Sequence, residues 1–343
     1  MNKYKYSGSV YFDALIKGVV NKTQMPLVEL TFGTSNASVS PINSNYEISA
    51  LHFKGHYLNR KSAKMPVSFI SLTELTGNLQ GQPFNGSLQV EDFTHPLISF
   101  TAHTQLNLEA LGHFYKPDTI EQMSGTLVVN ASFSGHADDK KSYESSGNVE
   151  MQNVNFKLKR KAVDFAKFNG HFILSDNQLT VKDFHGEIAG SDFQLNGSFN
   201  NIFSYLMIPD QTLACEADLS SRNIDLNELL EDKTKTTEED TAYRLDFSDK
   251  LNLKMRLNVG IISFRKFEAW QMRGAISLSN KILTTENLSF KAVEGTVLLQ
   301  GSINTTKKDS MLISYNADVK RLDINQLFYQ MGNFGENVLT DKT

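Results

Sequence analysis

Most of this chain alternates between apolar and polar residues with a period of two. In the stretch 251–257, Leu251, Leu253, Met255 and Leu257 fall on one side, and the residues between them are polar. Because successive side chains of a β-strand point to opposite faces, this pattern predicts a strand that is buried on one face and wet on the other. The same reasoning predicts strands within residues 48–55, 98–102, 125–133, 147–156, 213–219 and 310–318.

Two of these alternating stretches repeat each other. Residues 168–199 align without gaps on residues 272–303, at an offset that takes Gly170 to Gly274 and Gly197 to Gly301. Internal repetition of short alternating segments is typical of a repetitive β architecture, which forms an extended surface. The matched apolar positions, which we predict to line one side of a continuous sheet, are Phe172, Leu174, Leu179, Phe184, Phe193, Leu195, Ile276, Leu278, Leu283, Leu288, Val297 and Leu299.

A second pattern predicts a few short helices. Three predicted strands are each followed by the same pattern: an apolar residue, then Asn107, Asp225 or Asp323, then an apolar residue, two further residues and Leu. An Asn or Asp side chain accepts a hydrogen bond from a free backbone N–H at a helix start, and Glu228 and Gln326 can complete capping boxes. A further short helix is expected at 202–208, before a proline.

The three copies of this pattern divide the chain into three expected segments. Residues 1–115 form an N-terminal β-repeat segment, and residues 116–240 form a second one that ends in a short helix and a charged linker. Residues 241–343 form a third β-repeat segment, which we expect to continue in a longer chain. The fold class predicted is therefore mainly β, with repetitive antiparallel strands in an elongated curved sheet or open groove and a few short helices.

Composition excludes several classes of protein. The net charge of −4 and the scattered basic residues argue against a nucleic-acid partner. The only cysteine, Cys215, cannot form a disulfide within the chain and is predicted to be a buried thiol in a strand. No apolar run approaches the roughly 20 residues that a membrane-spanning helix needs.

Catalytic and metal-binding motifs are missing from the sequence. It contains neither a nucleophile elbow nor a phosphate-binding or dinucleotide-binding glycine motif. His52 and His56 have the spacing of two ligands on a helix, but the residues around them alternate as in a strand and supply no acidic third ligand. We therefore predict a protein that is not an enzyme and has no cofactor or metal site.

Several segments resemble the AsmA-like family of Gram-negative bacteria, in particular its large Bacteroidetes form. The resemblance rests on the segments 81–86, 190–206, 223–230, 322–328 and 333–335, and extends over about residues 45–343. It implies a periplasmic protein of repeating β-strands with an elongated hydrophobic groove, anchored to the inner membrane by an N-terminal helix that is not among these residues. Relatives, including the TamB-like proteins, are associated with outer-membrane biogenesis and with phospholipid movement between membranes.

The apolar positions leave two interpretations open. They can form the packed core between two sheets, or they can line an open trough that takes up the acyl chains of a phospholipid. An apolar trough needs no reactive group, because burial of a lipid tail is favourable by about 25 cal/mol per Å². The leading prediction is a segment that shields acyl chains during phospholipid transport. The alternative is a structural scaffold that assists the assembly of outer-membrane proteins, and envelope proteins are possible partners in both cases.

Overall fold

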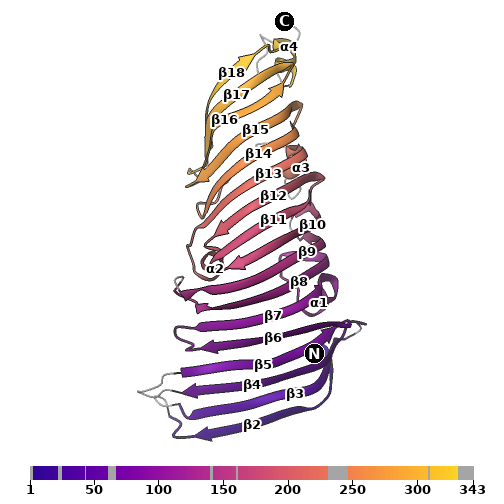
Figure 1. Ribbon diagram of the computed structural model, residues 1–343, viewed down its shortest axis with the longest axis vertical. Helices are drawn as coiled ribbons and strands as arrows, with labels where there is room; N and C mark the ends of the chain where they lie inside the picture. Colours follow the sequence, from indigo (N-terminus) through magenta and orange to yellow (C-terminus); the bar gives the residue numbers. More distant parts are fainter. Residues whose placement is uncertain are drawn as a thin grey trace.

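The computed structural model describes residues 3–21, 25–42, 44–60, 67–139, 142–159, 161–230, 246–307 and 310–330. In these residues the chain forms one long sheet of 18 strands that is open at both ends (Figure 1). The strands are β1 (Tyr4–Ser7), β2 (Val10–Lys17), β3 (Leu27–Pro41), β4 (Ile48–Arg60), β5 (Val67–Leu79), β6 (Gln82–Glu91), β7 (Leu97–Asn107), β8 (Ile120–His136), β9 (Glu144–Leu158), β10 (Lys161–Ser175), β11 (Gln178–Ile188), β12 (Ser191–Asn200), β13 (Leu213–Asp225), β14 (Leu251–Phe264), β15 (Phe267–Ser279), β16 (Ile282–Ala292), β17 (Gly295–Asn304) and β18 (Leu312–Lys320). The predicted fold class is confirmed.

Sequence order and spatial order coincide in this sheet. From β3 to β18, each strand pairs with the strand before it, and β1 pairs with the second half of β3 beside β2. These pairs are antiparallel except for β13 and β14, which run in parallel from Leu213 beside Leu251 to Asp225 beside Ser263. The three segments expected from the sequence are thus parts of a single continuous sheet.

Within the described ranges, four short helices lie along the two long sides of the sheet (Figure 1). The side that carries α1, α3 and α4 is called the α1 rim, and the side that carries α2 is called the α2 rim. The helices are α1 (Leu108–Phe114), α2 (Ile202–Met207), α3 (Leu226–Leu230) and α4 (Ile324–Gln330). The predicted caps of α1, α3 and α4 are confirmed, because the side chains of Asn107, Asp225 and Asp323 accept from backbone N–H groups of the first turn at 2.8–2.9 Å.

The sequence repeat is also a repeat of backbone irregularities. The pairing of β10 with β11 shifts register around Asn169, and the pairing of β15 with β16 shifts around the equivalent Arg273. The next pairs shift between Val181 and Phe184, and between Thr285 and Leu288. Because a bulge bends its strand and increases the local twist, bulges at matching positions in successive hairpins curve the whole sheet in one direction.

Asparagine side chains satisfy the backbone groups that these bulges leave unpaired. Asn155 accepts from the N–H of Lys167 at 2.8 Å, Asn169 from Asn153 at 2.9 Å, and Asn196 from Asp183 at 2.7 Å. Lys167, Asn153 and Asp183 have positive φ angles of 57°, 47° and 50°. An unpaired N–H is costly, so these bonds stabilise the bent conformation.

Three sequence expectations need correction or fall outside the description. The strands expected at 125–133 and 147–156 are longer and leave a shorter connection, since β8 continues to His136, β9 begins at Glu144, and the two strands pair as far as Ser134 and Glu144. The strand expected from Ser310 begins at Leu312. The expected charged linker, residues 231–240, lies outside the described residues.

Candidate functional site: an apolar groove

One face of the sheet carries two continuous rows of residues that are mostly apolar, with threonine or glycine at a few positions and no charged residue. A first row passes from β6 to β18 through directly opposed residues: Phe84, Thr104, Val129, Val149, Phe172, Val181, Gly197, Ala217, Met255, Ile276, Thr285, Gly301 and Tyr315. A second row runs beside it from Gly147 on β9 through Leu174, Leu179, Phe199, Cys215, Leu253, Leu278, Leu283 and Ile303 to Ile313 on β18. Directly opposed residues share a face, so both rows belong to one surface.

The opposite face is polar, with hydroxyl groups on β6 to β9 and charged side chains on β13 and β14. On β13 and β14, Glu216 lies 3.5 Å from Lys254, and the carboxylate of Asp218 accepts from Nη2 of Arg256 at 2.6 Å. The hydrogen bond from Arg256 lowers the pKa of Asp218 below its usual value. These side chains are exposed, whereas the apolar residues that alternate with them on β14 are half-buried or buried.

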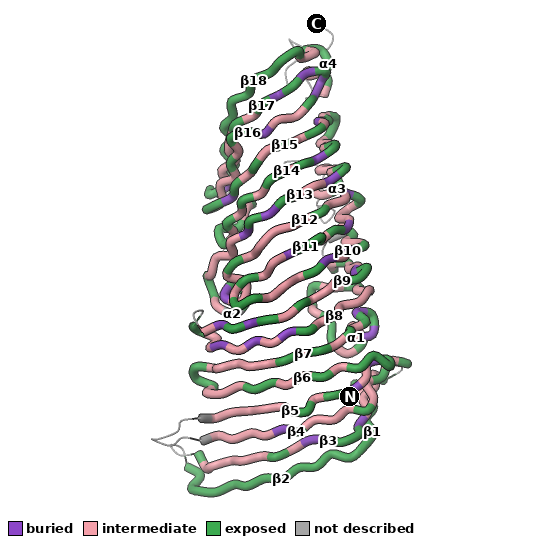
Figure 2. Tube along the Cα trace, in the orientation of Figure 1, coloured by how far each residue is buried: buried purple, intermediate pink, exposed green. Residues whose placement is uncertain are grey.

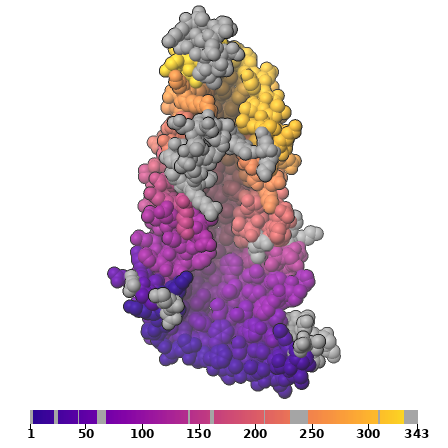
Figure 3. Space-filling model, turned by 180° about the vertical axis from the view of Figure 1, so that it is seen from behind, coloured from indigo at the N-terminus to yellow at the C-terminus, as the bar shows by residue number. Residues whose placement is uncertain are grey.

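This difference in exposure identifies the inner side of the curve. Side chains diverge on the outside of a curved sheet and converge on the inside, so the less exposed apolar face is the inner one. Figure 3 shows the hollow that the curve encloses, which runs along the molecule between two walls. The site is therefore a long groove with an apolar lining and a polar outer surface.

The groove contains all of the positions predicted from the sequence repeat. Pairings across β10, β11 and β12 and across β15, β16 and β17 bring them together on the inner face. None of them is exposed, and Leu278, Leu288 and Val297 are buried. Whether these residues contact lipid stays a prediction.

Side chains already fill part of the groove near the α1 rim. Six phenylalanines pack together there, and we call them the aromatic cluster: Phe156, Phe165, Phe168, Phe172, Phe184 and Phe193. Phe168, which is 6% exposed, has ring centroids of Phe156, Phe184 and Phe193 within 5.4–5.6 Å. Leu108 and Leu111 of α1 pack against this cluster. The packed-core interpretation thus holds locally.

At the α2 rim, a second helix packs onto the inner face. The ring of Phe203 in α2 lies 4.8 Å from the ring of Phe133 in β8, four strands before β12. Asn177 fixes α2, since its Oδ1 accepts from the N–H of Phe203 at 2.9 Å and its Nδ2 donates to Ser204 at 2.8 Å. Helices therefore narrow the groove from both long sides at the level of β8 to β12.

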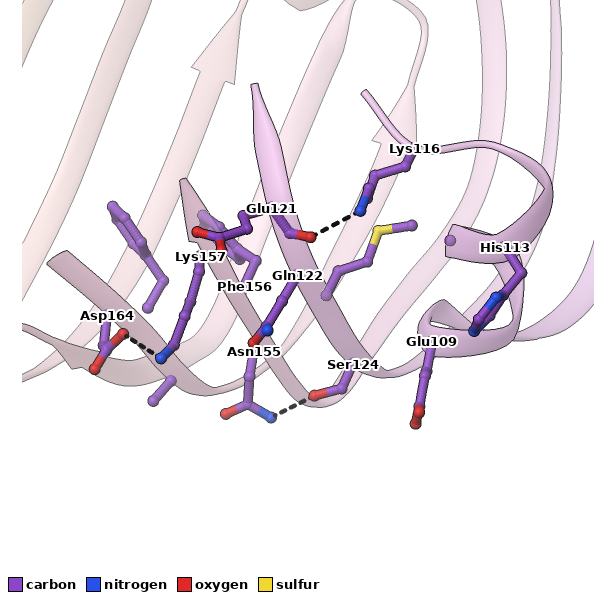
Figure 4. Close-up of a pocket in the computed structure, with 14 residues that line it drawn as sticks. Glu109, His113, Lys116, Glu121, Gln122, Ser124, Asn155, Phe156, Lys157 and Asp164 are labelled. Carbon is purple, nitrogen blue, oxygen red and sulfur yellow. Dashed lines mark hydrogen bonds and ion pairs between the residues drawn. The ribbon is translucent and has the colours of Figure 1, made fainter. Parts of the chain in front are cut away.

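A separate pocket of about 730 Å³ lies between α1 and the adjoining ends of β8, β9 and β10 (Figure 4). Its apolar wall is the stacked pair Phe156 and Phe165, with ring centroids 4.5 Å apart. Its polar groups are bonded to each other, with Lys157 3.5 Å from Asp164 and Lys116 donating to the carbonyl of Glu121 at 2.8 Å. The ion pair between Lys157 and Asp164 thus links the end of β9 to the start of β10.

Other candidate chemistry is structural in character. His52 and His56 lie on strand β4, and each contacts a different carboxylate, Glu74 at 3.2 Å and Glu29 at 3.0 Å. Within the described ranges, no three His, Cys, Asp or Glu side chains form a group that could hold a metal ion. Cys215 is buried as predicted, and burial raises the pKa of its thiol.

Sequence reasoning missed part of the lining. Leu253, Met255 and Leu257 of β14 lie on the inner face beside the predicted positions of β15, yet they fall outside the aligned repeat. Their alternation in the sequence was the signal that could have included them. The same holds for Val149 of β9, which is opposed to Phe172.

Comparisons with protein-family models, with curated proteins and with solved structures give no match to this chain. Among the helices described, none is both long enough and apolar enough to span a membrane.

Proposed function

We propose that this chain is a groove segment that shields acyl chains while phospholipid moves between the inner and outer membranes. The observation that carries the proposal is the lining of the inner face from β6 to β18, whose two rows are mostly apolar and contain no charged residue. A lipid tail can contact such a lining at many positions, and no single position binds the tail specifically.

The energetics suit a conduit. Burial of each methylene group stabilises a bound chain by about 0.8 kcal/mol, and the effect is non-directional. A tail can therefore slide along the groove without losing specific hydrogen bonds. The polar outer face, with its Glu216–Lys254 and Asp218–Arg256 pairs, keeps the segment soluble in an aqueous compartment.

The sequence resemblance to the AsmA-like family supports a location and partners for this activity. We place the segment in the periplasm, anchored to the inner membrane through residues outside the present sequence. Its ligand is a phospholipid or another lipid with acyl chains, and envelope proteins contact it at either membrane. It acts without a catalytic step, a cofactor or nucleic acid.

A scaffold for outer-membrane protein assembly is the second candidate. The aromatic cluster favours it, because Phe168 and its neighbours occupy the groove near the α1 rim with side chains. A scaffold of this kind requires a rigid curved sheet and no bound lipid.

Bound lipid distinguishes the two functions. We expect mass spectrometry of the protein, purified without detergent, to detect phospholipid. Leu299→Glu should abolish lipid loading, because Leu299 lies on the inner face opposite Leu288 and Ala317. The matched control is Leu298→Glu, since the adjacent Leu298 is 44% exposed on the outer face opposite Asp318.

Three outcomes count against the proposal. Absence of lipid from the unmodified protein favours the scaffold. Equal lipid loading in the Leu298 and Leu299 variants places the lipid elsewhere than in the groove. Unfolding by Leu195→Glu as well as Leu299→Glu, followed by far-UV circular dichroism, identifies these leucines as ordinary core residues.

A further inference from the structure

The pocket between α1 and the ends of β8, β9 and β10 has the size of a small-molecule site. Its volume of about 730 Å³ falls within the roughly 300–1,000 Å³ that is usual for such sites. Phe156, Phe165 and Met123 form its apolar wall. All three are half-buried, and the ends of these strands beside α1 contain both half-buried and exposed residues (Figure 2). The pocket can therefore take up the apolar part of a ligand.

A glycine keeps the pocket open on the side of α1. Gly112 faces β8, and a Cβ atom at this position would meet only the side chain of Met123, 3.3 Å from its Cε atom. Glycine is unfavourable inside a helix, because it loses the most conformational freedom on folding. A longer side chain at Gly112 would favour the helix but would occupy the pocket.

Five Lys, Asp and Glu side chains line the pocket, and two of them pair with each other. Lys157 lies 3.5 Å from Asp164. Lys116 donates to the main-chain carbonyl of Glu121 at 2.8 Å, and Glu109 accepts from a tyrosine hydroxyl at 3.3 Å. Among the described residues, no ion pair neutralises Lys116, Glu109 or Glu121. The pocket thus offers one cation and two carboxylates to a ligand.

The cation and one of these carboxylates lie at the same end of the pocket. Nζ of Lys116 is 2.8 Å from the carbonyl oxygen of Glu121, the residue that carries the carboxylate (Figure 4). A ligand with an anionic and a cationic group a few bonds apart can therefore meet both charges. Because a carboxylate accepts hydrogen bonds, Glu121 favours a primary ammonium, which has N–H donors, over a quaternary one.

The apolar wall of the pocket continues into the groove. Phe156 and Phe165 belong to the aromatic cluster, and their ring centroids lie 5.6 and 6.2 Å from that of Phe168. The two lining rows of the groove contain no charged residue, so they do not distinguish one lipid headgroup from another. A headgroup bound in the pocket would place the adjoining glycerol beside the aromatic cluster.

We propose that this pocket binds an ethanolamine phosphate ester, with the phosphate at Lys116 and the primary ammonium at Glu121. Such an ester occurs free, as in glycerophosphoethanolamine, and as the headgroup of a phospholipid whose acyl chains lie in the groove. The choice of phosphate as the anionic group rests on the proposed function. The pocket then supplies the preference among headgroups that the apolar lining lacks.

A titration with soluble esters tests the pocket without lipid. We expect glycerophosphoethanolamine to bind saturably to the full chain in a phosphorus NMR titration. Glycerophosphocholine has no N–H donor on its nitrogen and glycerophosphoglycerol has no cationic group, so both should bind on the order of tenfold more weakly.

Two variants that remove a charge test the assigned contacts. Lys116→Gln and Glu121→Gln should each raise the dissociation constant of glycerophosphoethanolamine on the order of tenfold. Lys182→Gln is the matched control and should leave the dissociation constant unchanged, because Lys182 is an exposed residue of β11 that does not line the pocket.

A variant that fills the pocket tests the location without a change of charge. Gly112→Leu places an apolar side chain in the pocket and should abolish binding of the ester. Leucine favours a helix more than glycine does, so far-UV circular dichroism should show an intact fold. Unchanged binding by the folded variant would place the ester elsewhere and overturn the proposal.

Lipid analysis then identifies the source of the ester. If the ester is a headgroup, mass spectrometry of the protein purified without detergent should show ethanolamine lipids enriched over their share in the cells of origin. Lys116→Gln should remove this enrichment and leave the total bound lipid unchanged. Binding of the soluble ester without any enrichment assigns the pocket to the free ester.

Three further results overturn the proposal. The first is no saturable binding of glycerophosphoethanolamine, the second is equal binding of the three esters, and the third is equal weakening by Lys182→Gln. Failure of the proposed function looks different. Leu299→Glu should lower the total bound lipid and leave binding of the soluble ester unchanged, and absence of lipid from a protein that binds the ester counts against the proposed function alone.

Discussion

The hairpins β10–β12 and β15–β17 have the same backbone but different side chains. Both contain register shifts at equivalent positions, and both contain the same tight turn with two positive φ angles, at Ala189–Gly190 and Val293–Glu294. Where the first hairpins place phenylalanines, the second place smaller aliphatic residues. Phe165, Phe168, Phe172, Phe184 and Phe193 correspond to Ala269, Met272, Ile276, Leu288 and Val297.

This difference separates two determinants of the groove. Bulges and turns set the curve, because they recur where the side chains do not. Side-chain volume sets how much of the enclosed space stays open. Ala269 is 0% exposed although its counterpart, Phe165, is a much larger residue. Neighbouring atoms therefore lie closer to the backbone at Ala269 than at Phe165.

The largest effect is expected at the centre of the aromatic cluster. Phe168→Ala removes the ring that contacts Phe156, Phe184 and Phe193, and should lower the free energy of unfolding by about 3–5 kcal/mol. Met272→Ala, at the half-buried equivalent position, should cost roughly half as much. Guanidinium unfolding followed by circular dichroism measures both variants, and equal losses would contradict the greater stabilisation expected of the aromatic side chains.

The next effect concerns lipid in the aliphatic hairpins. Ile276→Phe copies the half-buried Phe172 and should leave stability unchanged while it narrows the groove. Displacement of two methylene groups, at about 0.8 kcal/mol each, weakens lipid binding on the order of tenfold. Ser277→Phe is the control, because Ser277 is exposed on the outer face. Equal lipid binding by both variants in a fluorescent-lipid titration would show that this part of the groove does not limit capacity.

A smaller effect is expected at the helix that covers the aromatic cluster. Asn107→Ala removes the cap of α1 and should cost about 1 kcal/mol, because Leu108 and Ala110 of α1 are buried. Asp323→Ala removes the equivalent cap of α4, which buries none of its residues, and should leave the global unfolding midpoint unchanged. A drop in the midpoint for both variants would indicate that α4 also stabilises the sheet.

Local sequence signals predicted the elements of this fold. Period-two alternation identified β14 from Leu251 to Leu257, and the caps at Asn107, Asp225 and Asp323 located three helices. The repeat selected positions that share one face of the sheet, since equivalent residues occupy equivalent registers. These signals succeed because each depends on neighbours a few residues apart.

The curve and the connection between the repeats depend on distant partners. The hydrogen bond from the N–H of Lys167 to Asn155 stabilises the bend of β9 and β10. In the sequence, nothing distinguishes Asn155 from the many other polar residues, so this bend could not be predicted. The parallel pairing of β13 with β14 leaves no mark on their alternation, because either direction buries the same face. The period-two alternation likewise does not show whether Leu195 lines an open groove or belongs to a packed core.

The smallest expected effect is a pH dependence that only the aromatic hairpins show. Burial raises the pKa of Asp192 at the start of β12. Hydrogen bonds from the N–H groups of Asn223 and Arg222 and from the Arg222 side chain have a larger effect in the opposite direction, so the pKa of Asp192 lies below its usual value. A carboxyl group whose pKa is lowered in the folded state stabilises the fold at pH values above its pKa in the unfolded state, about 4. This stabilisation is lost as the pH falls through the pKa of the folded state. The equivalent position in β17 is Thr296, which does not titrate.

Asp192→Asn should therefore be less stable than the unmodified protein at pH 7 by on the order of 1 kcal/mol, and this difference should shrink below about pH 4. Thr296→Val is the control, because it changes a matching residue without a charge and should show the same small difference at every pH. Urea unfolding at pH 7, 5 and 3 measures both. A stability difference for Asp192→Asn that stays constant across this range would mean that the carboxylate acts as a neutral acceptor, and that its charge does not distinguish the two sets of hairpins.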